Sequence, residues 1–141
     1  MEGLRARGFE AVAVRLPPTR AGVAAPRLAR LAAPDIVLGG VSFGGRVASL
    51  VAAEAAAAGL LCLAYPLRDQ AAERTAHWPR IRCPALVVNG DADPLSDAVK
   101  LAALVTQLPA GRLEVVAGAG HDLRPHRDQV LDLAAIFLST L

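Results

Sequence analysis

The sequence predicts an α/β fold in which a mainly parallel sheet of about five strands lies between two layers of helices. Short apolar runs alternate with stretches that favour helices along the whole chain, a pattern typical of crossover units and parallel sheets. The chain has 141 residues, of which 54% are hydrophobic, so it can bury the core of one ordinary domain. We therefore expect a single three-layer α/β/α domain over residues 1–141.

Glycine and proline mark the ends of the elements expected in the first part of the chain. Gly8 favours the conformation that closes a helix, and the Pro17-Pro18 pair stops a strand. A helix over 23–33 would have to hold Pro26 in its first turn. The expected elements are the end of a helix at 1–8, a strand at 9–16, a helix at 23–33, a strand at 35–40 and a helix at 44–58.

The second part of the chain continues the alternation. Residues 67–82 are polar and irregular, and they separate two apolar runs. Ser96 is a candidate for the cap of the following helix. The expected elements are strands at 60–64, 85–88 and 112–117, and helices at 96–108 and 127–138.

The pentapeptide Gly40-Val41-Ser42-Phe43-Gly44 fits the pattern G-x-S-x-G and stands between an apolar run and a helix-forming run. A serine on a sharp strand-to-helix turn takes a strained conformation, so the residues two before and two after it need to be small. Such a turn places the hydroxyl at the helix N-terminus, where free N–H groups stabilise negative charge. This setting favours Ser42 as a nucleophile over an incidental serine in a glycine turn.

A nucleophilic serine needs a base to take its proton, and the base needs a carboxylate to orient it. Asp93 and His121 each follow a later expected strand, and ligands of parallel sheets bind beyond the carboxyl ends of strands. We therefore predict Ser42 as nucleophile, Asp93 as acid and His121 as base. Asp91 lies in the same Asn-Gly-Asp-Ala-Asp-Pro loop and is the reserve acid, although such loops also use Asp for turn bonds.

Four further residues are candidates for the oxyanion and substrate site. The Phe43 N–H follows the serine and is expected to stabilise an oxyanion, with Gly40 in the same turn. Arg46, one turn into the helix, could contact a carboxylate substrate or could cap or pair structurally. His77 lies beside Trp78 in the loop after a strand, a place for substrate contacts. His126 is expected at a helix start or on the surface.

Metal and phosphate sites are not predicted. The sequence has no H-x-x-x-H, C-x-x-C or H-E-x-x-H spacing, and no G-x-G-x-x-G or glycine loop with a following lysine. We expect no metal and no cofactor.

Composition argues against nucleic-acid and membrane partners. The net charge is only +2 and the arginines are spread along the chain. Arg46 and Glu54 interrupt the most apolar region, so no run nears the ~18 residues of a spanning helix. Residues 1–8 lack the apolar core of a signal peptide. We expect a cytoplasmic protein in which Cys62 and Cys83 are reduced.

Several segments together resemble a known family. These are G-G-V-S-F-G-G-R-V-A-S, A-Y-P, R-T-A-H-W, N-G-D-A-D-P and G-A-G-H-D-L-R-P. They resemble the small α/β-hydrolase-fold proteins of the dienelactone-hydrolase-like type, and most closely the bacterial relatives of the domain found in testis-expressed and non-specific-lethal complex subunits. The resemblance covers about residues 8–125 and implies the same roles for Ser42, Asp93 and His121. It implies no substrate, and the eukaryotic members of that branch act partly as interaction modules.

The chain departs from that fold near its start. In the α/β-hydrolase fold, a strand ahead of the first helix ends in a His-Gly loop, and this loop supplies one N–H of the oxyanion hole. No His-Gly occurs before Phe9, and the missing strand would lie between the strands expected at 9–16 and 35–40. We expect either an upstream true start or a shortened α/β-hydrolase fold without its N-terminal strands. In the shortened form the first two strands pair directly or another chain fills the gap.

The sequence thus predicts a serine hydrolase acting on a small ester, thioester or related acyl substrate. The alternative is a weakly active or inactive hydrolase-fold module that binds a ligand or a protein partner. A homodimer that covers a sheet edge is a further expectation.

Overall fold

Four parallel strands form the sheet of the computed structural model, which describes residues 2–141. Their spatial order, β1-β2-β3-β4, is also their order in the chain. In register, Leu38 faces Leu60, Leu60 faces Ala85 and Ala85 faces Gly111. The strands are β1 (Val37–Val41), β2 (Gly59–Leu63), β3 (Ala85–Gly90) and β4 (Gly111–Val116).

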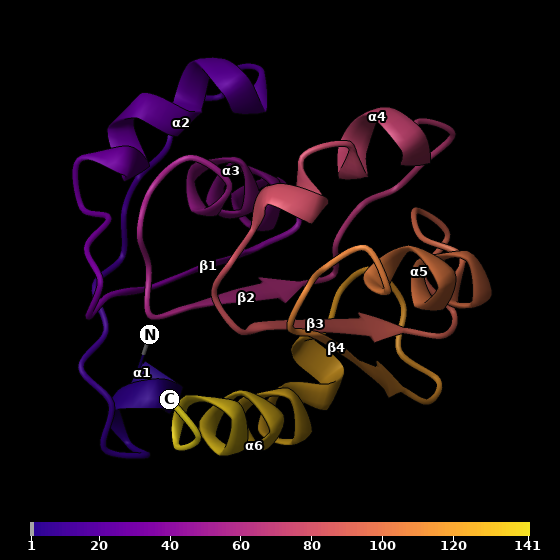
Figure 1. Ribbon diagram of the computed structural model, residues 1–141. Coiled ribbons are helices and arrows are strands. Elements are labelled where there is room, and N and C mark those ends of the chain that lie inside the picture. The colour runs from indigo at the N-terminus through magenta and orange to yellow at the C-terminus, as the bar shows by residue number, and fades with distance from the viewer. Residues whose placement is uncertain (1) are drawn as a thin grey trace.

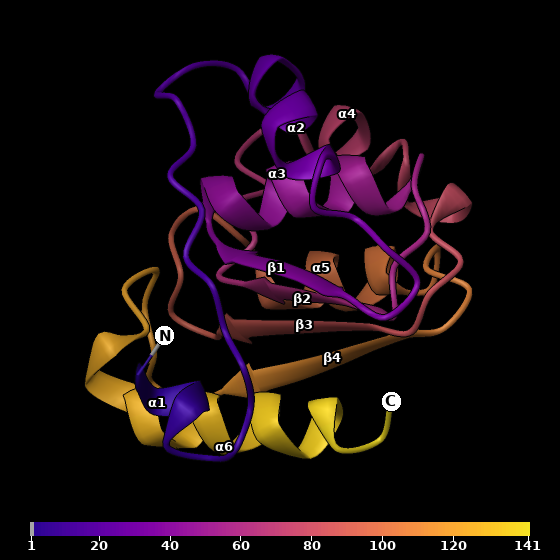
Figure 2. The same cartoon turned by 90° about the vertical axis from the view of Figure 1, so that its left-hand side faces the viewer.

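Helices cover both faces of this sheet and make three layers (Figure 1). One face carries α2 (Ala21–Ala29), α3 (Phe43–Ala52) and α5 (Ala98–Val105), and the other carries α6 (Arg127–Leu138). The short α1 (Glu2–Arg5) lies beside α6, so both chain ends are on that side (Figure 2). The α/β/α arrangement is therefore confirmed. No helix within residues 2–141 has the length and apolar character needed to cross a membrane.

Alternate residues of the central strands supply the two cores, because successive side chains of a strand point to opposite faces. Ala85 and Val87 of β3 pack with Leu101 in the core under α2, α3 and α5. Leu86 and Val88 pack instead with the core under α6. All six residues of β3 are buried, as expected for a strand covered on both faces.

The strand predicted at 9–16 is wrong, and the sheet has four strands instead of about five. These residues run along the molecule without strand structure, and Val12 is 78% exposed. A strand needs a paired neighbour, and alternating apolar residues do not provide one. The two expected strands consequently do not pair directly, and β1 forms one edge of the sheet. A homodimer across an edge stays a prediction.

Most helix limits differ from the prediction by a few residues. The helix predicted at 23–33 spans Ala21–Ala29, so Pro26 lies in its interior and not in its first turn. Helix α3 ends at Ala52 because the following residues return to the sheet, where the Ala58 N–H bonds the Ile36 carbonyl. Helix α5 begins at Ala98 and is capped by Asp97, whose carboxylate accepts from the Lys100 N–H at 2.7 Å.

The irregular segments hold short elements that were not predicted, whereas the last helix and Gly8 agree with the prediction. The segment 67–82 holds a short helix, α4 (Ala71–Thr75), and a 3-10 turn, η1 (Trp78–Arg80). A second 3-10 turn, η2 (Arg124–His126), precedes α6, whose limits match the prediction. Gly8 has φ +86° after α1, as a helix-closing glycine should.

We expect Leu86→Ala to lower the free energy of unfolding by about 2–5 kcal/mol, since it removes a fully buried side chain from the central strand. Urea denaturation measures this loss. Val99→Ala is the control, because Val99 is 82% exposed on α5, and it should change stability by less than ~0.5 kcal/mol. Equal effects of the two substitutions would contradict the placement of β3 in the core.

Candidate active site

Ser42 lies at a strained turn between β1 and α3. Its backbone has φ 51° and ψ −113°, a region that L-residues rarely adopt. The Ser42 N–H bonds the Leu63 carbonyl of β2 at 2.7 Å, and its carbonyl accepts from the Arg46 N–H at 3.1 Å. The turn is thus fixed to the sheet on one side and to the helix on the other. Its hydroxyl caps no N–H and remains available.

Glycine at position 40 is required by the close approach of the strand to the helix start. A Cβ at Gly40 would lie 2.8 Å from Gly44 Cα and 2.7 Å from the Gly44 carbonyl oxygen. The expectation that Gly44 must also be small for its own side chain is wrong, because a Cβ there would meet nothing within 4 Å. Gly45 is the tighter position, since its Cβ would lie 3.0 Å from the Gly40 carbonyl oxygen. The role of Gly40 is therefore steric.

The hydroxyl of Ser42 is joined to a histidine and a carboxylate. His121 Nε2 lies 2.8 Å from Ser42 Oγ, and His121 Nδ1 lies 2.9 Å from Asp93 Oδ2. Because a carboxylate only accepts, Nδ1 carries the proton of the neutral ring, and Nε2 accepts from the serine O–H. The three residues come from segments that follow β1, β3 and β4, at the carboxyl ends of parallel strands. The structure therefore brings together the three residues predicted as nucleophile, acid and base.

Asp93 is held by three donors and is fully buried at its side chain. Oδ1 accepts from the Leu95 N–H at 2.8 Å, and Oδ2 accepts from Asn89 Nδ2 at 3.2 Å as well as from His121. Asp91 makes a different contact, since its Oδ1 accepts from the Gly118 N–H at 2.8 Å. Of the two candidate acids, only Asp93 contacts the histidine.

The Phe43 N–H, which the sequence predicts as an oxyanion donor, is unpaired in the structure described over residues 2–141. It is the first N–H of α3. Free N–H groups of a first helical turn favour negative charge nearby. This N–H directly follows Ser42, so a carbonyl oxygen of a substrate attacked by Ser42 could accept from it.

A cavity of about 420 Å³ opens onto Ser42. Phe43 and Arg46 of α3 lie on its wall, and Arg46 forms no side-chain ion pair or hydrogen bond among the described residues, so a substrate contact of Arg46 stays a prediction. The remaining lining residues come from the segment after β2: Pro66, Arg68, Asp69, Gln70 and Arg74. Among the described residues no group of three His, Cys, Asp or Glu side chains could hold a metal ion.

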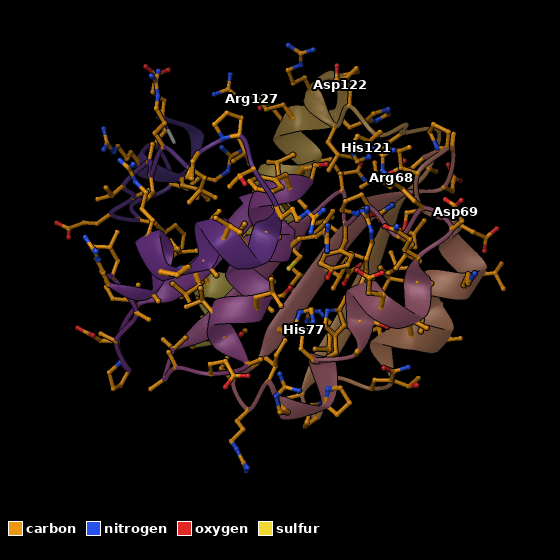
Figure 3. All side chains as sticks on the ribbon, turned by 90° about the horizontal axis from the view of Figure 1, so that it is seen from above. Arg68, Asp69, His77, His121, Asp122 and Arg127 are labelled. Carbon is orange, nitrogen blue, oxygen red and sulfur yellow. The ribbon has the colours of Figure 1, made fainter. Side chains whose placement is uncertain are left out.

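The structure does not place His77 at this cavity, which corrects the prediction that it contacts substrate. His77 is buried beneath α3, and its Nε2 lies 2.8 Å from the Ser49 hydroxyl. Ser49 donates to the Arg46 carbonyl at 2.9 Å, so the His77 N–H donates to Ser49. Figure 3 shows His77 apart from His121 and Arg68. Burial, and then the charges of Arg80 and Arg46, lower the pKa of His77 to about 4.

Sequence reasoning missed three contacts in and around the site. Arg68 lines the cavity, Asn89 donates to Asp93, and Ser49 bonds to His77. Arg68 follows β2 at the carboxyl end of the sheet, the same signal that identified the acid and the base. Asn89 lies inside β3 and is fully buried, so its polar side chain in an apolar run was a usable sign. Ser49 carries no such sign, because serine occurs often in Ala-rich helices.

A parallel sheet whose elbow serine bonds through histidine to an aspartate defines an α/β-hydrolase-class fold. Residues 16–137 match the alpha/beta hydrolase domain family, and the chain belongs to this family. Among solved structures it is similar to an alpha-beta serine hydrolase homologue from Coxiella burnetii, with TM-score 0.64 and 27% identity over 74% of this chain and 49% of that one.

A thermophilic esterase from Thermogutta terrifontis shares the fold, with TM-score 0.72 and 20% identity, covering 95% of this chain and 77% of that chain. Among curated proteins, the polyketide synthase ThaQ of Burkholderia thailandensis is 45% identical over 49 residues, which are 35% of this chain and 2% of the synthase. The chain therefore spans about half the length of the Coxiella burnetii protein and a small part of the synthase.

We expect Gly40→Ala to abolish or strongly reduce any activity of Ser42, since the new methyl group would overlap Gly44 and displace the elbow. Gly44→Ala is the matched control, because its methyl group points into open space. Labelling of Ser42 by a fluorophosphonate, with circular dichroism to verify folding, measures the difference. Equal labelling of the two variants would contradict the steric argument.

Stability should fall between pH 6.5 and about 4 because of His77. The unfolded chain binds a proton at its ordinary pKa of about 6.5, whereas the folded protein binds it only near pH 4. The contribution of neutral His77 to the free energy of unfolding is therefore present above pH 6.5 and decreases as the pH falls. At pH 5 the loss amounts to about 2 kcal/mol. His77→Gln should therefore show a smaller stability difference between pH 8 and pH 5 than the native protein in urea titrations. Equal differences would contradict a neutral buried His77.

Proposed function

We propose that this protein is a serine hydrolase that cleaves a small ester, thioester or related acyl compound. One observation carries the proposal: the uninterrupted hydrogen-bonded line from Ser42 through His121 to the buried Asp93, at the mouth of a cavity. A serine hydroxyl beside an oriented imidazole is the arrangement that nucleophilic acyl transfer requires. The membership in a hydrolase-domain family and the likeness to a serine hydrolase homologue support it.

The geometry supports the following steps. Ser42 Oγ bonds to the acyl carbon while His121 Nε2 takes the hydroxyl proton, and the Phe43 N–H stabilises the resulting oxyanion. His121 then gives the proton to the departing alcohol or thiol as its bond to the acyl carbon breaks. Water attacks the acyl-enzyme, loses a proton to His121 and releases the acid, and the proton returns to Ser42. Asp93 keeps Nδ1 protonated and stabilises the imidazolium.

A finer relationship, to the dienelactone-hydrolase-like proteins and the testis-expressed subunit domain, is also part of this proposal. It rests on the spacing of the sequence segments around Ser42, Asp93 and His121. These segments form the elbow, the acid loop and the base loop of the structure.

A fluorophosphonate probe should label the purified protein at Ser42, because such probes need a serine activated by its base. Ser42→Ala and His121→Ala should abolish labelling, and Asp93→Asn should lower ester turnover by about 10³–10⁴. Asp91→Asn is the matched control: it alters a carboxylate of the same loop that does not contact His121.

Folded protein that is not labelled would contradict the hydrolase proposal. It would favour the alternative, an inactive hydrolase-fold module that binds a ligand or partner. Equal losses from Asp93→Asn and Asp91→Asn would contradict the assignment of the acid.

A further inference from the structure

The cavity at Ser42 is strongly cationic. Three guanidinium groups line it, those of Arg46, Arg68 and Arg74, and Asp69 is the one carboxylate among its lining residues. An excess of like charge in a cleft is unfavourable in the folded protein and raises the local concentration of anions. Burial, followed by the charges of Arg46 and Arg68, lowers the pKa of Arg74, so the positive charges of Arg46 and Arg68 act on Arg74.

Two of the three arginines are free to bind something else. Arg74 is occupied, because its Nη1 donates to the Pro66 carbonyl at 2.7 Å and its Nε and Nη2 donate to Gln70 Oε1. The side chains of Arg46 and Arg68 form no hydrogen bond or ion pair with any residue in 2–141. The cluster therefore presents two unused planar donor groups beside the serine.

Both free arginines are held close to Ser42 by their backbones. Arg46 is one turn along α3, and its N–H bonds the Ser42 carbonyl at 3.1 Å. Arg68 has φ 51° and its N–H bonds the Leu95 carbonyl at 2.7 Å, so its loop is fixed to the segment that carries Asp93. Arg68 also lines the cavity that opens onto Ser42.

We propose that the substrate is an acidic acyl compound, whose carboxylate or phosphate group is bound by Arg46 and Arg68 while Ser42 attacks its acyl carbon. This inference rests on the proposed hydrolase function and names its substrate class. Guanidinium groups match the two oxygens of a carboxylate or phosphate, and they keep their charge at all physiological pH values. A cavity of about 420 Å³ admits a small compound of this kind.

The test compares two esters that differ only in charge. Mono-4-nitrophenyl glutarate carries a free carboxylate, and methyl 4-nitrophenyl glutarate is its neutral counterpart with the same leaving group. We expect kcat/KM of the native protein to be at least about tenfold higher for the anionic ester, and this ratio to fall about tenfold in Arg46→Gln/Arg68→Gln. Arg82→Gln, an exposed arginine in the loop before β3, should leave the ratio unchanged.

Fluorophosphonate labelling of the same preparations distinguishes failure of the acidic-substrate inference from failure of the proposed hydrolase function. Labelled Ser42 with a ratio near one, or a ratio that survives the double substitution, overturns the acidic-substrate inference and leaves the hydrolase function standing. Protein that neither reacts with the probe nor cleaves either ester overturns both. Retained labelling of the double variant verifies that its elbow is intact.

Competition against the probe distinguishes the two anion sources. Glutarate or inorganic phosphate should slow labelling of the native protein but not of the double variant. Stronger protection by glutarate assigns a carboxylate, and stronger protection by phosphate assigns a phosphate group. Protection by neither anion overturns the inference.

Discussion

The close approach of Gly40 to the start of α3 is the constraint on which the site depends. Only a residue without Cβ allows the strand to pass directly under Gly44, and Ser42, in the turn between these two glycines, has a positive φ. The turn directs α3 with its N-terminus at the carboxyl edge of the sheet. Three features then follow from this one turn: a serine hydroxyl that caps no N–H of α3 and can bond to His121, the free N–H of Phe43, and an arginine one turn later. The strain is sustained by bonds to β2 and α3 on either side.

The other half of the site depends on the contact between the loops after β3 and β4. The Asp91 N–H bonds the Val116 carbonyl, the Ala92 N–H bonds the Ala119 carbonyl, and the Asp91 side chain accepts from Gly118. Gly90 permits this contact, since a Cβ there would lie 2.9 Å from Ala119 Cβ. Asp91 and Asp93 therefore divide two tasks within one loop. Asp91 joins the acid loop to the base loop, and Asp93 faces the ring that the second loop carries.

Local patterns in the sequence predicted the features that are determined by residues close together in the chain. They failed for features that depend on contacts with residues far away in the sequence. The alternation of elements, the elbow and the order of Ser42, Asp93 and His121 followed from short segments and their positions after strands. The segment 9–16 shows why periodicity is insufficient, because a strand forms only where another backbone can pair with it. His77 shows the same limit for polar residues: its loop position indicated a substrate contact, but Ser49 on α3 provides a buried partner. The arginine cluster joins residues from two separate segments, which no single pattern links.

Helix α3 connects the proposed anion site to the buried network below it. Ser49 donates to the carbonyl of Arg46, and His77 donates to Ser49, so the turn that carries Arg46 is fixed from the interior. Burial, and then the nearby charges of Arg80 and Arg46, lower the pKa of His77, which therefore supports this turn as a neutral donor. A protonated His77 would add a further positive charge beneath a cluster that already lacks anionic partners. The buried network thus supports the turn that carries Arg46 without adding to the positive charge of the cavity, which comes from the three arginines that line it.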